Sequence, residues 1–200
     1  MASEVSIGNR SLDKLGATHI VSLEDRDPKA VALKEAYPVV RDAELRRHRY
    51  RFSLGRALLA ASDTPPEFGF DFAYPLPTDC LQVIQIGEYD LGPTPNASHQ
   101  APTELWSIEA REILTDFAAP LKIRYVRRIT DVGLFDSCFL ETFASRLGYE
   151  TCYRITGSNE REDRCLRDYR IGLKEGVRAN AVEVAPTYPT DDTWVTARLG

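Results

Sequence analysis

Residues 135–147 read FDSCFLETFASRL, and this stretch decides the fold. Four large apolar residues recur at every fourth position and form one ridge along a helix: Phe135, Phe139, Phe143 and Leu147. A ridge of this kind must be buried against other elements. We expect the helix to pass Gly148, continue to about Ile155 and end at Gly157.

Three further helices are expected to pack with this ridge. The first begins at the capping residue Ser3 and ends at Gly16, and the second begins at Asp27-Pro28 and continues to about Ser62 with a kink at Pro38. The last helix follows residues 157–159, and four apolar positions mark its expected buried face: Leu166, Tyr169, Leu173 and Val177. Because no such helix can bury its stripe alone, the four should pack together.

The middle of the chain has the pattern of β-structure. Asp63-Thr64-Pro65-Pro66 ends the second helix, because two prolines remove two backbone donors. Residues 74–77 predict an extended, turn-rich entry, and strands are expected at residues 81–86, 104–110, 112–117 and 121–129. Connections this short predict antiparallel hairpins.

The predicted fold class is therefore α+β, with a four-helix bundle formed by the N- and C-terminal helices, an inserted antiparallel β-sheet domain and an extended C-terminal arm. The expected segments are 1–64 for the N-terminal helices, 65–133 for the β-rich insertion, 134–182 for the C-terminal helices and 183–200 for the arm. Both ends of the chain up to residue 182 then meet in one helical domain.

Composition indicates an ordinary globular chain. It has 200 residues, 43% of them hydrophobic, and a formal net charge of -5, which disfavours a protein whose main task is coating nucleic acid. The N-terminus lacks the pattern of a signal peptide, and no stretch has the roughly 20 apolar residues that cross a bilayer, so we expect a soluble protein without membrane contact.

No motif in the sequence predicts catalysis. There is no G-x-S-x-G elbow, Walker A loop or G-x-G-x-x-G, and the three histidines lack the spacing of metal ligands: His19, His48 and His99. The four cysteines contain no C-x-x-C pair and are expected to be reduced thiols in the core: Cys80, Cys138, Cys152 and Cys165. We therefore expect a protein that is not an enzyme and that holds no cofactor and no metal.

Two charged segments are candidates for contact with partners. The first contains six arginines and His48, and its arginines project all around the predicted helix: Arg41, Arg46, Arg47, Arg49, Arg51 and Arg56. The simpler interpretation is a helix that buries arginine stems and forms ion pairs with Asp42 and Glu44, while contact with DNA or an acidic protein surface is the alternative.

The second segment is the C-terminal arm, which combines an aromatic anchor with charges that can fix the register of an interface. Its candidate partner-binding residues are Tyr188, Asp191, Asp192, Trp194 and Arg198. The alternative is that Trp194 folds back onto its own domain.

Several stretches, in order along nearly the whole chain, resemble phage adaptor proteins of the tail tubular protein A family. They are residues 3–15, Tyr37-Pro38-Val39-Val40-Arg41-Asp42, Tyr74-Pro75-Leu76-Pro77-Thr78-Asp79-Cys80-Leu81, Ile113-Leu114-Thr115-Asp116, Arg124-Tyr125-Val126 and Thr156-Gly157-Ser158-Asn159. Each stretch is a sequence typical of a helix, a turn or a strand and contains no catalytic residues, so the resemblance rests on the order of the stretches.

The resemblance implies a structural adaptor subunit of a phage head-to-tail connector. Such a subunit assembles into a twelve-fold ring below the portal, docks tail or nozzle proteins and lets DNA pass during ejection without sequence recognition. Its extended C-terminal segment corresponds to residues 184–200 here and would insert between portal subunits. The implied location is the virion, after assembly in the host cytoplasm.

Two competing functions follow from the residues themselves. A helical nucleic-acid-binding regulator would use the arginine-rich segment and would show a steep salt dependence of duplex binding. A cell-wall hydrolase would need two carboxylates converging in a pocket.

Overall fold

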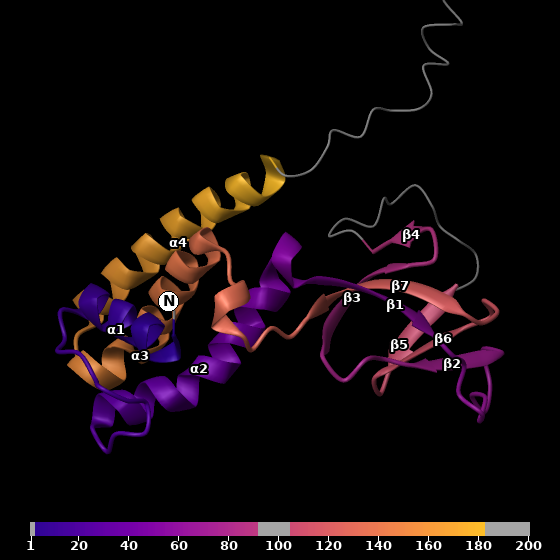
Figure 1. Cartoon of the computed structure of the whole chain (residues 1–200), viewed down its shortest axis with the longest axis horizontal. Coiled ribbons are helices and arrows are strands. Elements are labelled where there is room, and N and C mark those ends of the chain that lie inside the picture. Colours follow the sequence, from indigo (N-terminus) through magenta and orange to yellow (C-terminus); the bar gives the residue numbers. More distant parts are fainter. Residues whose placement is uncertain (1–2, 92–104, 183–200) are drawn as a thin grey trace, which may run out of the picture.

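The computed structural model describes residues 3–91 and 105–182 (Figure 1). In these residues the chain forms an elongated molecule, with helices at one end and strands at the other. The helices are α1 (Glu4–Leu15), α2 (Pro28–Arg47), η1 (Arg51–Ser53), η2 (Val132–Leu134), α3 (Ser137–Thr156) and α4 (Asn159–Val182). The strands are β1 (Leu54–Leu59), β2 (Phe72–Pro75), β3 (Cys80–Ile86), β4 (Tyr89–Asp90), β5 (Trp106–Glu109), β6 (Glu112–Thr115) and β7 (Leu121–Arg127).

The predicted helix ends are confirmed where the sequence supplies capping residues. The Ser3 side chain accepts a hydrogen bond from the Ser6 amide, and Asp27 accepts from the Lys29 amide just ahead of Pro28. Gly16 and Gly157 end α1 and α3 in the left-handed conformation, at φ 65° and 64°. These local signals mark ends of three of the four helices.

The aromatic ridge lies at the centre of the helical end of the molecule. Phe139, Phe143 and Leu147 are fully buried, and the Phe143 ring meets Tyr37 of α2 edge to face with ring centroids 5.0 Å apart. Helix α3 packs against each of the other three helices. The other three helices therefore pack around α3, which carries the ridge.

The prediction that the second helix continues to about Ser62 is wrong. Helix α2 ends at Arg47, His48 is extended, and residues 54–59 form β1, which pairs antiparallel with β7. At Gly55 the two strands approach closely, since a Cβ at this position would lie 2.7 Å from the side chain of Arg127. Pairing with a distant strand overrides the local helical preference, and β-structure begins before the expected boundary at residue 64.

The strands form two antiparallel sheets in the described chain, where the sequence predicted one sheet region. One sheet has the order β1-β7-β3-β4 and the other β2-β6-β5. All the predicted strands are present, and β5 and β6 form the expected hairpin, but β6 and β7 lie in different sheets. The expectation of a hairpin between β6 and β7 is therefore wrong, because β7 pairs with β1 and β3.

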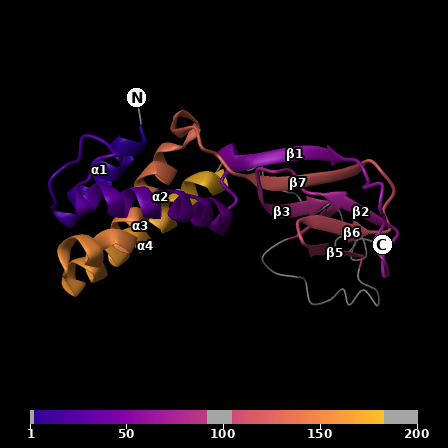
Figure 2. The ribbon, with the colours of Figure 1, turned by 90° about the horizontal axis from the view of Figure 1, so that it is seen from below.

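A second core lies between the two sheets, which are seen one above the other in Figure 2. Tyr74 and Ile113 of one sheet and Ile123 and Tyr125 of the other are buried there. Since side chains alternate along a strand, the intervening residues of each strand point to the outer faces of this sandwich. Ile84 of β3 and Val126 of β7 are exceptions, because both are buried in the helical core.

The inner face of α4 is shifted from the predicted one. Of the four predicted positions, Tyr169 is buried as expected, Leu166 and Leu173 are half-buried, and the side chain of Val177 lies outside the described residues. Cys165, which was not predicted, is also buried. The close neighbours of α3 are Gly172 and Gly176, whose Cβ positions would lie 3.7 Å and 3.5 Å from the Thr142 hydroxyl. Glycine has no side chain that adds to the apolar pattern of a helix. The pattern therefore points to the face that carries the leucines, although the contact with α3 includes the glycines.

The coarse prediction of an α+β protein with antiparallel sheets is confirmed. Within residues 3–91 and 105–182, no helix is both long and apolar enough to cross a membrane.

Candidate functional site

The partner-binding residues predicted in the arm lie outside the described residues. These are Tyr188, Asp191, Asp192, Trp194 and Arg198.

The arginine-rich segment does not form one binding face. Arg41 is buried and its guanidinium lies 2.8 Å from Asp42, which also accepts a hydrogen bond from Arg128 at 2.7 Å. Arg47 lies over the Tyr169 ring, and Arg49 donates to the Leu91 carbonyl. These contacts are structural, and they favour the interpretation of buried stems and ion pairs over a groove-binding helix.

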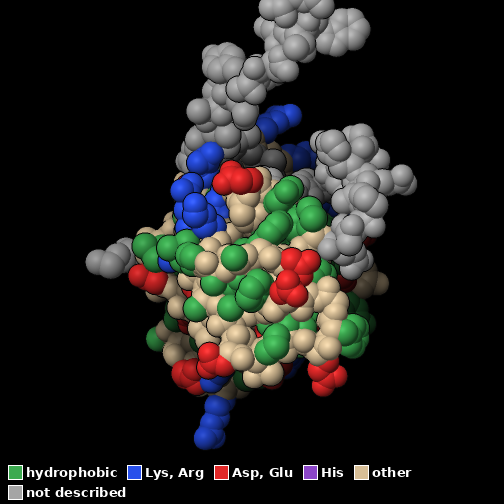
Figure 3. Space-filling view, turned by 90° about the vertical axis from the view of Figure 1, so that its right-hand side faces the viewer, with side chains coloured by type: hydrophobic (Ala, Val, Ile, Leu, Met, Phe, Trp, Pro, Cys, Tyr) green, Lys and Arg blue, Asp and Glu red, His purple; other side chains and the backbone are tan. Residues whose placement is uncertain are grey.

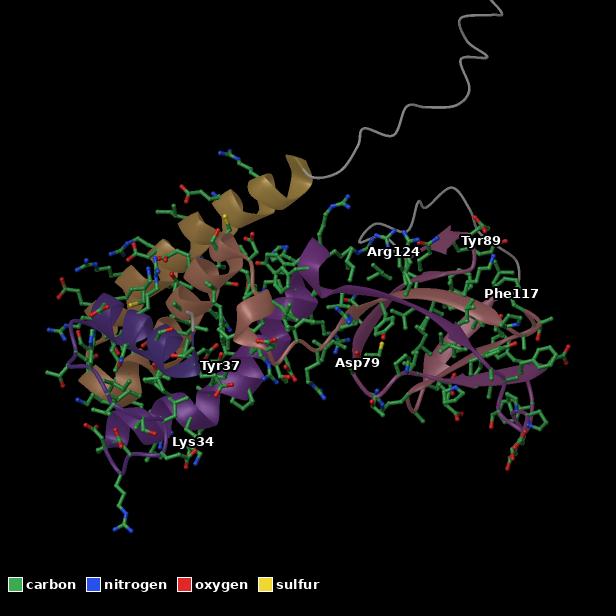
Figure 4. The ribbon with its side chains drawn as sticks, in the orientation of Figure 1. Lys34, Tyr37, Asp79, Tyr89, Phe117 and Arg124 are labelled. Atoms are coloured by element: carbon green, nitrogen blue, oxygen red, sulfur yellow. The ribbon has the colours of Figure 1, made fainter. Side chains whose placement is uncertain are left out.

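Arg56 differs from the other arginines, because β1 places it on the outer face of the four-stranded sheet. Its register partner there is Arg124 of β7, and Lys122 of β7 stands opposite Leu58. The three cations line a hollow of about 490 Å³. We refer to Arg56, Lys122 and Arg124 as the basic face, and Figure 4 labels Arg124 on it.

The basic face lacks neutralising partners in the part of the chain that the structure describes. No ion pair involves any of its three cations, and the polar contact of Arg124 is a long hydrogen bond to Gln85, at 3.5 Å. One carboxylate, that of Glu88, also lines the hollow but forms no ion pair with these cations in the described structure. Like charges held opposite each other across a sheet repel, so this face is suited to an anionic partner.

Apolar side chains are also exposed at the β-rich end of the molecule. Leu58 is 66% exposed and Phe68 86% exposed, and Tyr89 stacks on Phe117 with ring centroids 5.9 Å apart. Figure 3 shows apolar side chains spread over this end with scattered carboxylates among them. Aromatic and apolar groups with a charged surround are typical of protein interfaces.

A buried polar cluster links the helices at the other end. Glu44 of α2 is only 1% exposed, and one of its carboxylate oxygens accepts a hydrogen bond from the Tyr169 hydroxyl of α4 at 2.9 Å. The other oxygen has no partner in the described structure. Burial raises the pKa of the Glu44 carboxyl, against the opposing effects of the Tyr169 hydrogen bond and of Arg47 and Arg146.

A second hollow, of about 480 Å³, lies beside α1 and contains Ser6, Asp13 and His19. His19 lies 2.6 Å from Asp13, a pair that its sequence spacing did not reveal. The Ser6 hydroxyl, however, donates to the Ser3 carbonyl at 2.8 Å as part of the helix cap. It has no contact with His19 and so lacks the arrangement of an activated nucleophile.

Neither hollow contains two facing carboxylates, which is the arrangement that a hydrolase of the predicted kind would need. Among the described residues, no three metal-binding side chains are grouped for an ion. The four cysteines are free, and burial raises the pKa of the Cys165 thiol to about 11, with Cys152 as a close neighbour. At neutral pH that thiol is protonated and unreactive.

Comparison with known proteins adds no family. No protein-family model matches the chain, and no curated protein matches its sequence.

The basic face is not predicted by the sequence, because its members come from two strands and one of these falls in the predicted second helix. Arg56 lies in that helix prediction, and Lys122 and Arg124 lie in the strand predicted at residues 121–129. The alternation of Arg56 with Leu58 around Ala57 was the available signal.

Proposed function

We propose that this chain is a structural subunit of a phage head-to-tail connector, with no catalytic role. It assembles into a ring under the portal and leaves a channel through which DNA passes without sequence recognition. The observation that carries the proposal is the order of the family-like stretches along the chain, which run from α1 through the sheets to the turn between α3 and α4.

The arrangement of the helices and strands supports this proposal. The N-terminal and C-terminal helices lie together at one end, and the strands between them extend from the other end (Figure 1). In the proposed connector the helices act as a four-helix bundle that forms the wall. The strands form the insertion, which meets tail proteins or neighbouring subunits, and residues 183–200 form the arm that anchors to the portal.

The surface of the β-rich end supports a role in protein contact. It exposes Leu58, Phe68 and Ile108 and carries the basic face. Ring subunits contact two different neighbours through two different surfaces, and the ring closes when the rotation between subunits permits it. A protein with this task needs surfaces for partners and no cleft for a substrate.

Electron microscopy of the full chain mixed with its portal protein tests the proposal. We expect one closed ring of subunits bound to each portal, with the twelve copies that the family resemblance implies. A chain that stays monomeric and does not bind the portal would contradict the proposal.

Removal of the residues after Ala185, or Trp194→Ala, tests the arm separately. We expect either change to leave the circular dichroism spectrum unchanged and to abolish portal docking. Unchanged docking would show that the arm is not the anchor.

A further inference from the structure

The outer faces of the sandwich carry opposite charge. The basic face occupies the outside of the four-stranded sheet. On the outside of the three-stranded sheet and its continuations lie four carboxylates, Asp71, Glu109, Glu112 and Asp116, which we call the acidic face.

Strand register places these carboxylates together and away from the core. Glu109 of β5 is the register partner of Glu112 of β6, and the buried neighbours Ile113 and Thr115 point the other way, into the sandwich. Asp116 accepts a hydrogen bond from the Asp71 amide at 3.0 Å, which joins the ends of β6 and β2.

The acidic face lacks neutralising partners among the described residues. None of its four carboxylates forms an ion pair there, and Glu109 accepts instead from the Ser107 hydroxyl at 2.6 Å. One cation lies close to it, Arg111 in the β5–β6 turn, and its guanidinium donates to the Pro77 carbonyl at 2.7 Å. The acidic face therefore keeps a net negative charge.

From these observations we infer that the basic face of one copy binds the acidic face of a second copy. The inference rests on the proposed ring and identifies the two surfaces that meet in it. Two complementary faces on opposite sides of one sandwich give a head-to-tail contact, which is the kind of contact that closes into a ring. Exposed Leu58 between the cations adds an apolar contact at the centre of the interface.

Charge and composition favour a second copy over nucleic acid as the occupant of the basic face. Three cations neutralise few phosphates, and the formal net charge of -5 opposes a polyanion. The same charge distribution does not oppose a second copy, because each copy presents both signs to its neighbours. Attraction of this kind weakens as salt screens it.

Sedimentation velocity of the full chain at several protein and salt concentrations tests the inference. We expect Arg56→Glu with Arg124→Glu, or Glu109→Lys with Glu112→Lys, to weaken self-association by about ten-fold or more, because each places like charges opposite one another. The chain with all four substitutions should associate again, and so should a 1:1 mixture of the two double variants.

A control matched to Arg56→Glu with Arg124→Glu is Lys34→Glu with Arg154→Glu, which makes the same change in net charge on exposed residues of the helical end. We expect it to leave self-association within about two-fold of the wild type, since the altered charges lie far from the interface.

Three results would overturn the inference. In the first, the double variants associate as the wild type does. In the second, the wild-type chain and the 1:1 mixture both stay monomeric at low salt. In the third, Arg56→Glu with Arg124→Glu removes binding of a short DNA duplex without changing self-association. If rings still form on the portal in these cases, the inference fails and the proposed function stands, whereas absence of rings on the portal refutes the proposed function itself.

Discussion

Replacing Glu44 with glutamine should change how the stability of the protein depends on pH. The Glu44 carboxyl is almost fully buried between α2 and α4, with one oxygen bonded to the Tyr169 hydroxyl and the other without a partner in the described structure. Burial raises the pKa of this carboxyl above its value of 4.5 in an unfolded chain. The folded state therefore binds the proton more tightly than the unfolded state.

The sign of the effect follows from this difference. The stability that Glu44 contributes is fully present below its unfolded pKa and is lost as the pH rises through its folded pKa. In that window the free energy of unfolding falls with a slope that approaches about 1.4 kcal/mol per pH unit. The amide of Glu44→Gln does not titrate and keeps an oxygen for the Tyr169 hydroxyl, so the variant lacks this slope.

Urea unfolding of both proteins from pH 4 to pH 8 measures the difference. We expect the variant to gain stability relative to the wild type as the pH rises above about 4.5 and the gain to level off at higher pH. As a control, Glu35→Gln changes an exposed residue of the same helix and should alter the free energy of unfolding by less than about 0.5 kcal/mol. A difference between wild type and Glu44→Gln that is the same at every pH would show that burial does not raise the pKa of the Glu44 carboxyl.

Two predictions test the helical core and its caps. Phe143→Ala removes a fully buried ring from the centre of the helices and should lower the free energy of unfolding by about 3–5 kcal/mol, whereas Phe68→Ala, at an exposed position, should change it by less than about 0.5 kcal/mol. If the two changes lowered the free energy of unfolding by the same amount, Phe143 would not belong to the core. Asp27→Ala removes the acceptor for the Lys29 amide at the start of α2 and should cost about 1 kcal/mol in the same assay, so an unchanged midpoint would show that this cap does not stabilise the helix.

Helix caps and helical repeats in the sequence correctly predicted the helices that residues close together in the chain determine. Ser3 and Gly16 bound α1, and Asp27-Pro28 begins α2. Three of the four ridge residues define α3, namely Phe139, Phe143 and Leu147, whereas Phe135 was wrongly placed in this helix and precedes its cap Asp136. In each case a capping residue or a helical repeat acts within one element. Such signals do not depend on where the rest of the chain lies.

The failures are at places where distant residues decide the structure. Residues 54–59 are a strand because β7 pairs with them, and Gly55 fits there because the stem of Arg127 occupies the space of a Cβ. The inner face of α4 depends on Gly172 and Gly176 meeting α3, and glycine has no apolar side chain to reveal such a contact.

The candidate site was hidden for the same reason. Arg56 and Arg124 are 68 residues apart in the numbering, and only the register of β1 with β7 brings them together. The proximity of Glu109 and Glu112 could be predicted, because both flank the turn of the expected hairpin. Their position on the face opposite the cations could not be predicted, because it depends on the packing of the second sheet on the first.

A reconstruction of the full chain bound to its portal is the strongest test of the proposal that this chain is a ring subunit. We expect a closed ring in which Arg56 and Arg124 of each copy lie against Glu109 and Glu112 of the next. Single copies scattered on the portal, or no binding at all, would contradict it.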